Sequence, residues 1–150
     1  MSLASKYIAT LLCLTALACT PTVPSARFEA DFAKATKAYD AGDFETARRY
    51  WKPLADNFDL AALRNMGHLY RLGLGVEKSP QKALSYYQRA ANLGYAPAQF
   101  NLAMMYLKSD AIAYDGELGR KWLALSAAQN YPPAVSWQRL QDMALKPYEK

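Results

Sequence analysis

An internal repeat with a period of 36 residues leaves this chain few possible folds. Segments 60–70 and 96–106 carry the same residue types at matched positions: Ala62 and Ala98, Asn65 and Asn101, Tyr70 and Tyr106. The same spacing holds through three copies further along each unit: Tyr50, Tyr86 and Trp122; Trp51, Tyr87 and Leu123; Ala55, Ala91 and Ala127. A unit of this length cannot bury its apolar face alone, so the units must stack. The period therefore predicts helix pairs packed in a row.

Helix-capping residues return with the same period. Asp43, Ser79 and Asp115 each stand just before a helical pattern, and their side-chain oxygens can accept hydrogen bonds from free backbone N–H groups. Gly94 and Asn130 lie 36 residues apart at the other end of a helix, where both tolerate the left-handed conformation that ends it. The second helix of each unit therefore has a predicted start, and in two of the units it also has a predicted end.

The resulting fold prediction is all-α, with about three helix pairs and a C-terminal capping helix that follows Pro132. The predicted helices span residues 27–40, 43–57, 59–72, 79–93, 96–108, 116–129 and 132–145. The first unit has Phe58 where the second has Gly94, so we expect its turn to use Asn57 instead. Small alanines at matched positions predict close approach of the helices, with aromatic residues filling the space between them.

The N-terminal segment is typical of an export signal. Lys6 precedes an apolar stretch over residues 7–18, which is too short to span a bilayer as a helix and ends in Ala16-Leu17-Ala18. This segment resembles a bacterial lipoprotein signal, which implies that Cys19 is lipidated. Cleavage before Cys19 or after Ala26, giving a soluble periplasmic protein, is the alternative. We expect a signal peptide over 1–18, a tether over 19–27, a repeat domain over 28–145 and a tail over 146–150.

One whole repeat carries a family resemblance. Three strings hold it: Gly67-His68-Leu69-Tyr70-Arg71-Leu72-Gly73-Leu74-Gly75-Val76, Lys82-Ala83-Leu84-Ser85-Tyr86-Tyr87-Gln88-Arg89-Ala90-Ala91 and Gly94-Tyr95-Ala96-Pro97-Ala98-Gln99. They resemble the Sel-one-like repeat family, a relative of the tetratricopeptide repeats. The third copy departs from the pattern, because Ser109 and Ala111 stand where loop glycines are expected. The resemblance implies a right-handed superhelix (solenoid) of helix pairs with a concave, partner-binding groove.

The sequence offers little for catalysis, so we predict no enzyme and no cofactor. A single histidine excludes a histidine cluster for a metal, and no zinc or phosphate-loop motif is present. Ser79 and Lys82 match the Ser-x-x-Lys of penicillin-interacting enzymes, but an N-cap explains Ser79 better and the companion motifs are absent. The net charge of +5 comes without a basic run, which argues against a nucleic-acid partner.

The first helix of each unit is expected to line the groove, by analogy with tetratricopeptide pairs. The expected partner-binding residues are Arg64, Asn65, His68 and Arg71 in the second unit and Phe100, Asn101, Met104 and Lys108 in the third. Arg64 and Arg71 have a solvated helix face as their alternative role. The two asparagines are poor residues inside a helix and still recur, so they bind either a partner peptide or the backbone of a neighbouring repeat.

We therefore expect a cell-envelope scaffold or adaptor, which binds a segment of another envelope protein in its groove. The lipid on Cys19 would hold it at a membrane, with an outer-membrane or periplasmic location and a homodimer as one arrangement. A factor that binds one cognate protein is a related hypothesis. The alternative from another class is a peptidoglycan binder or a minor cell-wall or β-lactam hydrolase, in which the tyrosines and His68 would contact the ligand.

Overall fold

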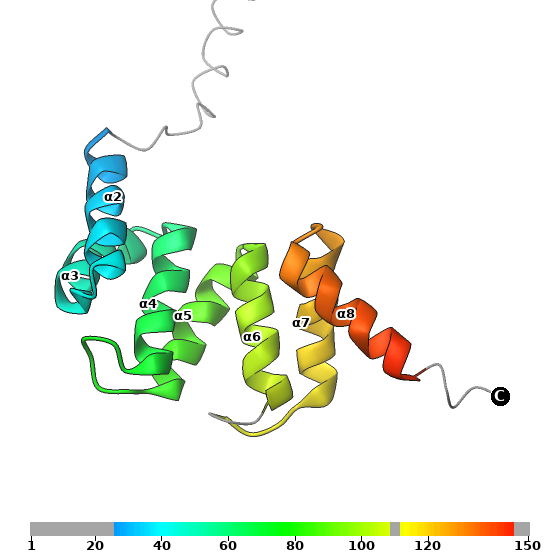
Figure 1. Ribbon diagram of the computed structural model, residues 1–150. Coiled ribbons are helices and arrows are strands. Elements are labelled where there is room, and N and C mark those ends of the chain that lie inside the picture. The colour runs from blue at the N-terminus through cyan, green and yellow to red at the C-terminus, as the bar shows by residue number, and fades with distance from the viewer. Residues whose placement is uncertain (1–25, 109–111, 146–150) are drawn as a thin grey trace, which may run out of the picture.

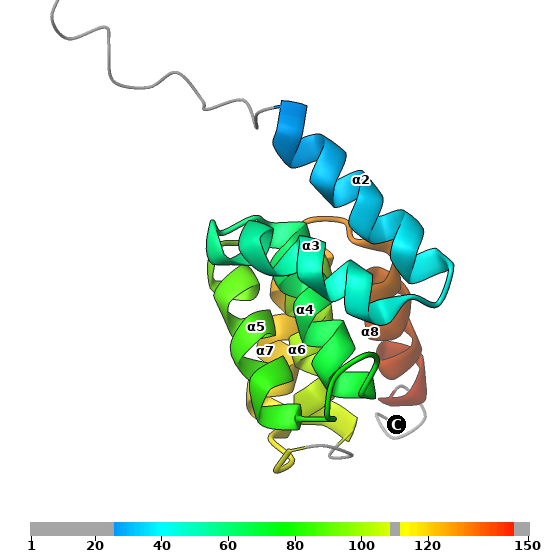
Figure 2. The same ribbon diagram turned by 90° about the vertical axis from the view of Figure 1, so that its left-hand side faces the viewer.

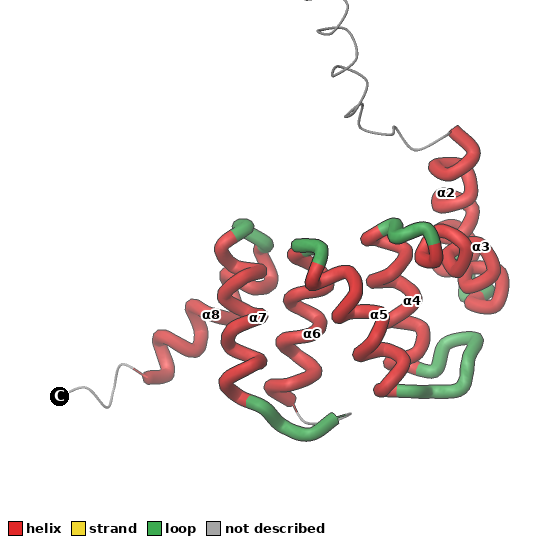
Figure 3. The backbone as a smooth tube through the Cα atoms, turned by 180° about the vertical axis from the view of Figure 1, so that it is seen from behind, coloured by secondary structure: helices red, strands yellow, loops and turns green. Residues whose placement is uncertain are grey.

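The computed structural model describes residues 26–108 and 112–145, which form seven α-helices and no β-strand (Figures 1 and 3). The helices are α2 (Ala26–Asp40), α3 (Phe44–Asp56), α4 (Leu60–Leu72), α5 (Pro80–Asn92), α6 (Ala96–Lys108), α7 (Gly116–Ala128) and α8 (Pro132–Leu145). Every predicted helix is present with each end within one residue of its expected position. The all-helical solenoid is confirmed.

The predicted N-caps are confirmed. Each capping side chain accepts a hydrogen bond from a backbone N–H three residues further on: Asp43 from Thr46 at 3.0 Å, Ser79 from Lys82 at 3.3 Å and Asp115 from Leu118 at 2.9 Å. These bonds satisfy donors that the first turn of a helix leaves free. Ser79 is therefore used in the start of α5, as its capping interpretation predicts.

The turn after α3 differs from the prediction. Gly94 and Asn130 take the expected left-handed conformation, with φ of 86° and 58°. In the first unit, however, Phe58 itself has a φ of 63°, and Asn57 instead ends the helix with a side-chain bond to the Pro53 carbonyl at 2.8 Å. The expectation that Asn57 would replace Phe58 in the turn is wrong. The Arg89 guanidinium lies 5.2 Å from the Phe58 ring centroid, which is a cation–π contact.

Each helix packs mainly on the helix before it and the helix after it. Viewed along the row, α5 and α7 lie on one side and α4 and α6 on the other (Figure 2). The matched alanines Ala62, Ala98 and Ala134 are fully buried, so they mark the closest contacts between helices. Tyr87 and Trp51 fill the space beside them, as the periodic aromatics predict.

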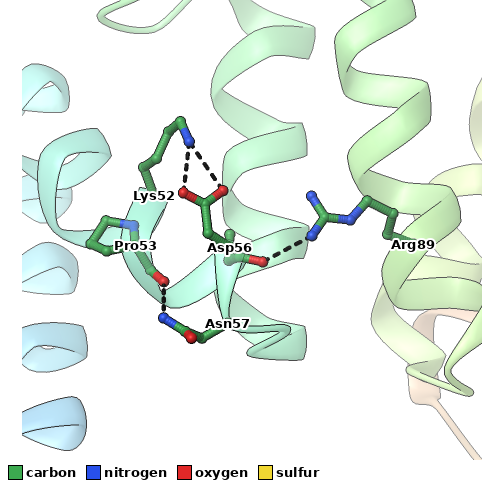
Figure 4. A network of polar contacts seen from close by, with 6 residues as sticks. Lys52, Pro53, Asp56, Asn57 and Arg89 are labelled. Carbon is green, nitrogen blue, oxygen red and sulfur yellow. Dashed lines mark hydrogen bonds and ion pairs between the residues drawn. The ribbon is translucent and has the colours of Figure 1, made fainter.

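Side chains also reach from one repeat to the backbone of the previous one. Arg89 on α5 donates through Nη2 to the Ala55 carbonyl near the C-terminal end of α3, at 3.1 Å (Figure 4). One unit later, the Gln129 side chain on the next helix pair donates through Nε2 to the Gly94 carbonyl, just after α5, at 2.9 Å. Such bonds satisfy carbonyls that the end of a helix leaves free, and they join successive units.

The expected signal peptide, the lipidated Cys19 and the tail over 146–150 lie outside the described residues. Ser109 and Ala111 lie outside them as well. The helix α2 begins at Ala26, so the last two residues of the expected tether are helical. Of the described helices, none is both long and apolar enough to cross a membrane.

Candidate functional site

The helix row holds a cavity of about 650 Å³, which we call the main groove. Its aromatic lining residues are Phe32, Tyr39, Trp51, Tyr95 and Tyr131, and its other lining residues are Thr36, Ala61, Arg64, Asn65, His68 and Pro97. They come from α2, α3 and α4 and from the residues that open α6 and α8. A volume of this size suits a bound segment of another molecule.

The register of α4 explains how it serves both the groove and the core. Ala61, Arg64, Asn65 and His68 are spaced three, one and three residues apart, so they share one face of the helix. The face next to them carries the buried residues Ala62, Leu63, Met66 and Leu69. Packing of the core face therefore turns the polar face towards the groove.

The first helix pair supplies an aromatic wall that the sequence interpretation missed. The Tyr39 ring lies 5.5 Å from the Trp51 ring and 6.2 Å from the imidazole of His68, measured between centroids. These side chains belong to α2 and α3, whereas the prediction considered only one face of the later units. The sequence did contain a sign of Tyr95 and Tyr131, because these tyrosines stand 36 residues apart and directly follow Gly94 and Asn130.

Two hydrogen-bond donors among the groove residues have no acceptor. The Nε of Arg64 and the Nε1 of Trp51 are buried without a hydrogen-bond partner. The Nη1 of Arg64 donates to Oδ1 of Asn65 at 3.1 Å, so the asparagine orients the guanidinium. A buried donor without an acceptor costs about 1–3 kcal/mol, which a ligand oxygen would recover.

His68 is neutral at physiological pH. Burial, followed by the charges of Arg64 and Arg71, lowers its pKa from 6.5 to about 4. Its Nδ1 lies 3.5 Å from Nη2 of Arg71, and because a guanidinium can only donate, Nδ1 is the acceptor nitrogen of the imidazole. The positive charge of this face at pH 7 therefore comes from arginine.

Acidification is expected to destabilise the fold through His68. The pKa of His68 is about 4 in the folded protein and 6.5 in the unfolded chain. The stability that neutral His68 contributes is therefore complete above pH 6.5 and is lost as the pH falls towards 4. Because the ring is only half-buried, we expect a loss of about 1–2 kcal/mol between pH 7 and pH 4.5. Urea denaturation at both pH values measures it. His68→Gln should show a smaller loss over the same range, and an equal loss in both proteins would contradict the assignment.

A second, smaller cavity of about 190 Å³ lies between α4 and α6, and we call it the side pocket. Its lining residues are Arg71, Phe100, Asn101, Met104, Met105 and Lys108. The Nδ2 of Asn101 is buried here without a hydrogen-bond partner. Among the described residues, no side-chain hydrogen bond joins Asn65 or Asn101 to the backbone of a neighbouring repeat. Neither cavity has a carboxylate among its lining residues.

The eight residues predicted from sequence thus fall into two groups. Arg64, Asn65 and His68 line the main groove, whereas Arg71, Phe100, Asn101, Met104 and Lys108 line the side pocket. The two cavities adjoin, because the His68 ring lies beside Arg71 and the Phe100 ring packs edge-on against Tyr131 at 5.8 Å. The role of these residues in binding stays a prediction.

Comparisons with known proteins agree on the repeat. A family model described as the Sel1 repeat matches residues 60–95 and 96–131, which contain α4–α5 and α6–α7. A sel1-like repeat-containing protein of Acanthamoeba polyphaga mimivirus is 38% identical over 55 residues, covering 37% of this chain and 10% of that protein.

Two crystal structures share the fold. A Sel1 repeat protein from Oxalobacter formigenes has a TM-score of 0.64 at 34% identity, over 69% of this chain and 41% of that one. A protective antigen present in uropathogenic Escherichia coli strains and displaying an SLR fold has a TM-score of 0.63 at 25% identity, over 71% of this chain and 24% of that one. The chain spans less than half the length of each of these relatives. Residues 60–131 match the model of two consecutive Sel1 repeats, and the chain is similar in fold to these Sel1 repeat structures.

Proposed function

We propose that this chain is a protein-interaction module that holds a segment of a partner protein in the main groove. The observation that carries the proposal is the combination of an open cavity of about 650 Å³ with two buried donors, on Arg64 and Trp51, that have no partner. Sel1 repeats are protein-interaction scaffolds, which supports the same function. The proposed role is recognition rather than catalysis.

The chemistry of the groove describes the partner segment. Backbone carbonyls of an extended segment would accept from the buried donors of Arg64 and Trp51. Aromatic residues at both ends of the groove would pack on its side chains, and the unpaired charge of Arg64 favours a segment with acidic residues. An acidic, extended segment with apolar residues therefore fits the groove best.

We further propose that the module works in the bacterial cell envelope. Lys6, the apolar stretch over 7–18 and the small residues before Cys19 support export, and a lipid on Cys19 would keep the groove near a membrane. The partner would then be another envelope protein. A cysteine that is not lipidated would instead leave the same groove free in the periplasm.

Reversing the charge of Arg64 is expected to weaken partner binding by about tenfold or more, because it removes the donor and repels acidic residues. The measurement is in-cell crosslinking followed by affinity capture of the full-length chain, with Arg64→Glu compared to the unchanged protein. Lys121→Glu on α7 is the matched control, since it makes the same charge change at an exposed residue outside both cavities.

The variants separate the possible results. Thermal melting must first show that Arg64→Glu folds. Phe100→Ala, at the side pocket, is the second variant. Equal capture by the unchanged protein, Arg64→Glu and Phe100→Ala would refute the groove as the binding surface. Capture that survives in Cys19→Ala would show that the groove, not the anchor, selects the partner. Retention on purified cell wall without any captured protein would favour the glycan-binding alternative instead.

A further inference from the structure

We infer that the side pocket is a carboxylate-binding site, which takes the side chain of a glutamate from the bound partner. The inference rests on the proposed function in one respect, namely that the glutamate belongs to a partner protein bound in the main groove. The site itself is defined by the residues of α4 and α6 that line the pocket. The inference gives Asn101 and Lys108, which do not line the main groove, a role in binding an acidic side chain of the partner.

The first argument is an unsatisfied donor. The side-chain nitrogen of Asn101 is buried in the pocket wall without a hydrogen-bond partner. An asparagine at this place in α6 is already unfavourable for the helix, because its side chain competes for backbone hydrogen bonds. A small rotation of the side chain would bring this nitrogen to the cavity, where a carboxylate oxygen would accept from it and remove the cost of leaving it unpaired.

The second argument is charge. Arg71 and Lys108 stand in the last turns of α4 and α6 and both line the pocket. In the described part of the chain, no ion pair within 4.0 Å neutralises either cation. The near contacts of both are uncharged: the imidazole of His68 beside Arg71, and the Trp137 ring 5.4 Å from Nζ of Lys108. Both cations therefore keep donors for an anion.

The third argument is size and shape. A cavity of about 190 Å³ lies below the range of about 300–1,000 Å³ typical of drug-sized ligands, so it suits a single side chain. Phe100, Met104 and Met105 offer apolar surface for methylene groups, next to the polar end formed by the cations. Glutamate has both parts. Because the pocket adjoins the main groove at His68, a segment in the groove can place this side chain in it.

Two small probes test the site without any partner protein. N-acetylglutamate α-amide carries only the side-chain carboxylate, and N-acetylglutamine α-amide is its neutral counterpart of the same shape. We expect the glutamate probe to shift the side-chain amide resonance of Asn101 saturably in NMR spectra of the full-length chain. Binding of the glutamine probe should be at least about tenfold weaker, because it cannot pair with the cations.

Charge variants complete the test. Lys108→Gln should weaken binding of the glutamate probe by about threefold or more, whereas Lys121→Gln on the exposed face of α7 should not change it. Equal binding of both probes, or saturable shifts confined to Trp51 and Arg64, would overturn the inference. Absence of saturable shifts would overturn it too. Loss of partner capture in Arg64→Glu without probe binding would leave the groove standing and remove only the pocket.

Discussion

Replacing Tyr87 with alanine is expected to lower the free energy of unfolding by about 3–5 kcal/mol. The ring is completely buried between the helices of the central repeats and is the largest fully buried side chain of the described residues. Alanine would leave a cavity that rigid helices on both sides cannot close, so the cost includes lost transfer energy and lost contacts. Urea denaturation followed by circular dichroism measures the change.

Tyr87→Phe is the matched control, because it keeps the ring and removes only the hydroxyl. That oxygen is buried near the Arg71 guanidinium but makes no well-directed hydrogen bond to it, so its removal should cost little or even stabilise the fold. We therefore expect phenylalanine to change the free energy of unfolding by less than about 1 kcal/mol. A large loss in Tyr87→Phe, or an unchanged stability in Tyr87→Ala, would contradict the packing described here.

The helices could be predicted from sequence because their limits are set by local physics. A side-chain oxygen such as that of Ser79 can cap only the turn that follows it, and Gly94 ends a helix through its own backbone conformation. The 36-residue period then repeats these local signals, which removes the ambiguity of a single copy. The stacking order follows, since short turns leave each helix only its sequence neighbours to pack on.

Phe58 shows where local rules stop. A bulky residue rarely takes a left-handed conformation, so the sequence favoured Asn57 for the turn. The structure places the Arg89 guanidinium, from the following repeat, against the Phe58 ring. Arg89 also donates to the Ala55 carbonyl in the same turn. The backbone hydrogen bonds of this turn are local, because the N–H groups of Phe58 and Asp59 donate to the carbonyls of Ala55 and Leu54. Residues 55–60 do not reveal the contact with Arg89, which lies 31 residues further along the chain.

The candidate site was predictable in part for the same reason. The period identifies which face of α4 and α6 is not core, and this places Arg64 and Asn101 on the concave side. It does not show that their surroundings form two cavities instead of one groove. That division depends on where the rings of Phe100 and Tyr131 meet, and on Trp51, which comes from another helix pair. Side-chain packing decides these features after the register is fixed.

Gly67→Val is expected to destabilise the fold by about 3 kcal/mol, although valine is a better helix residue than glycine. A Cβ at position 67 would lie 2.7 Å from two carbon atoms of the Tyr87 ring, closer than real Cβ contacts allow. The ring is fully buried and cannot move aside without disturbing the neighbouring helices. Thermal and urea denaturation of this variant measure the loss.

The double variant distinguishes this clash from a general intolerance of substitution in α4. In the Tyr87→Ala background the space beside residue 67 is empty, so Gly67→Val should cost less than about 1 kcal/mol or even recover stability. The interaction energy in this cycle should therefore be about 2 kcal/mol or more. Additive effects would mean that the two side chains do not share one space. An interaction of the expected sign would establish that Gly67 permits the close approach of α4 to the Tyr87 ring on α5.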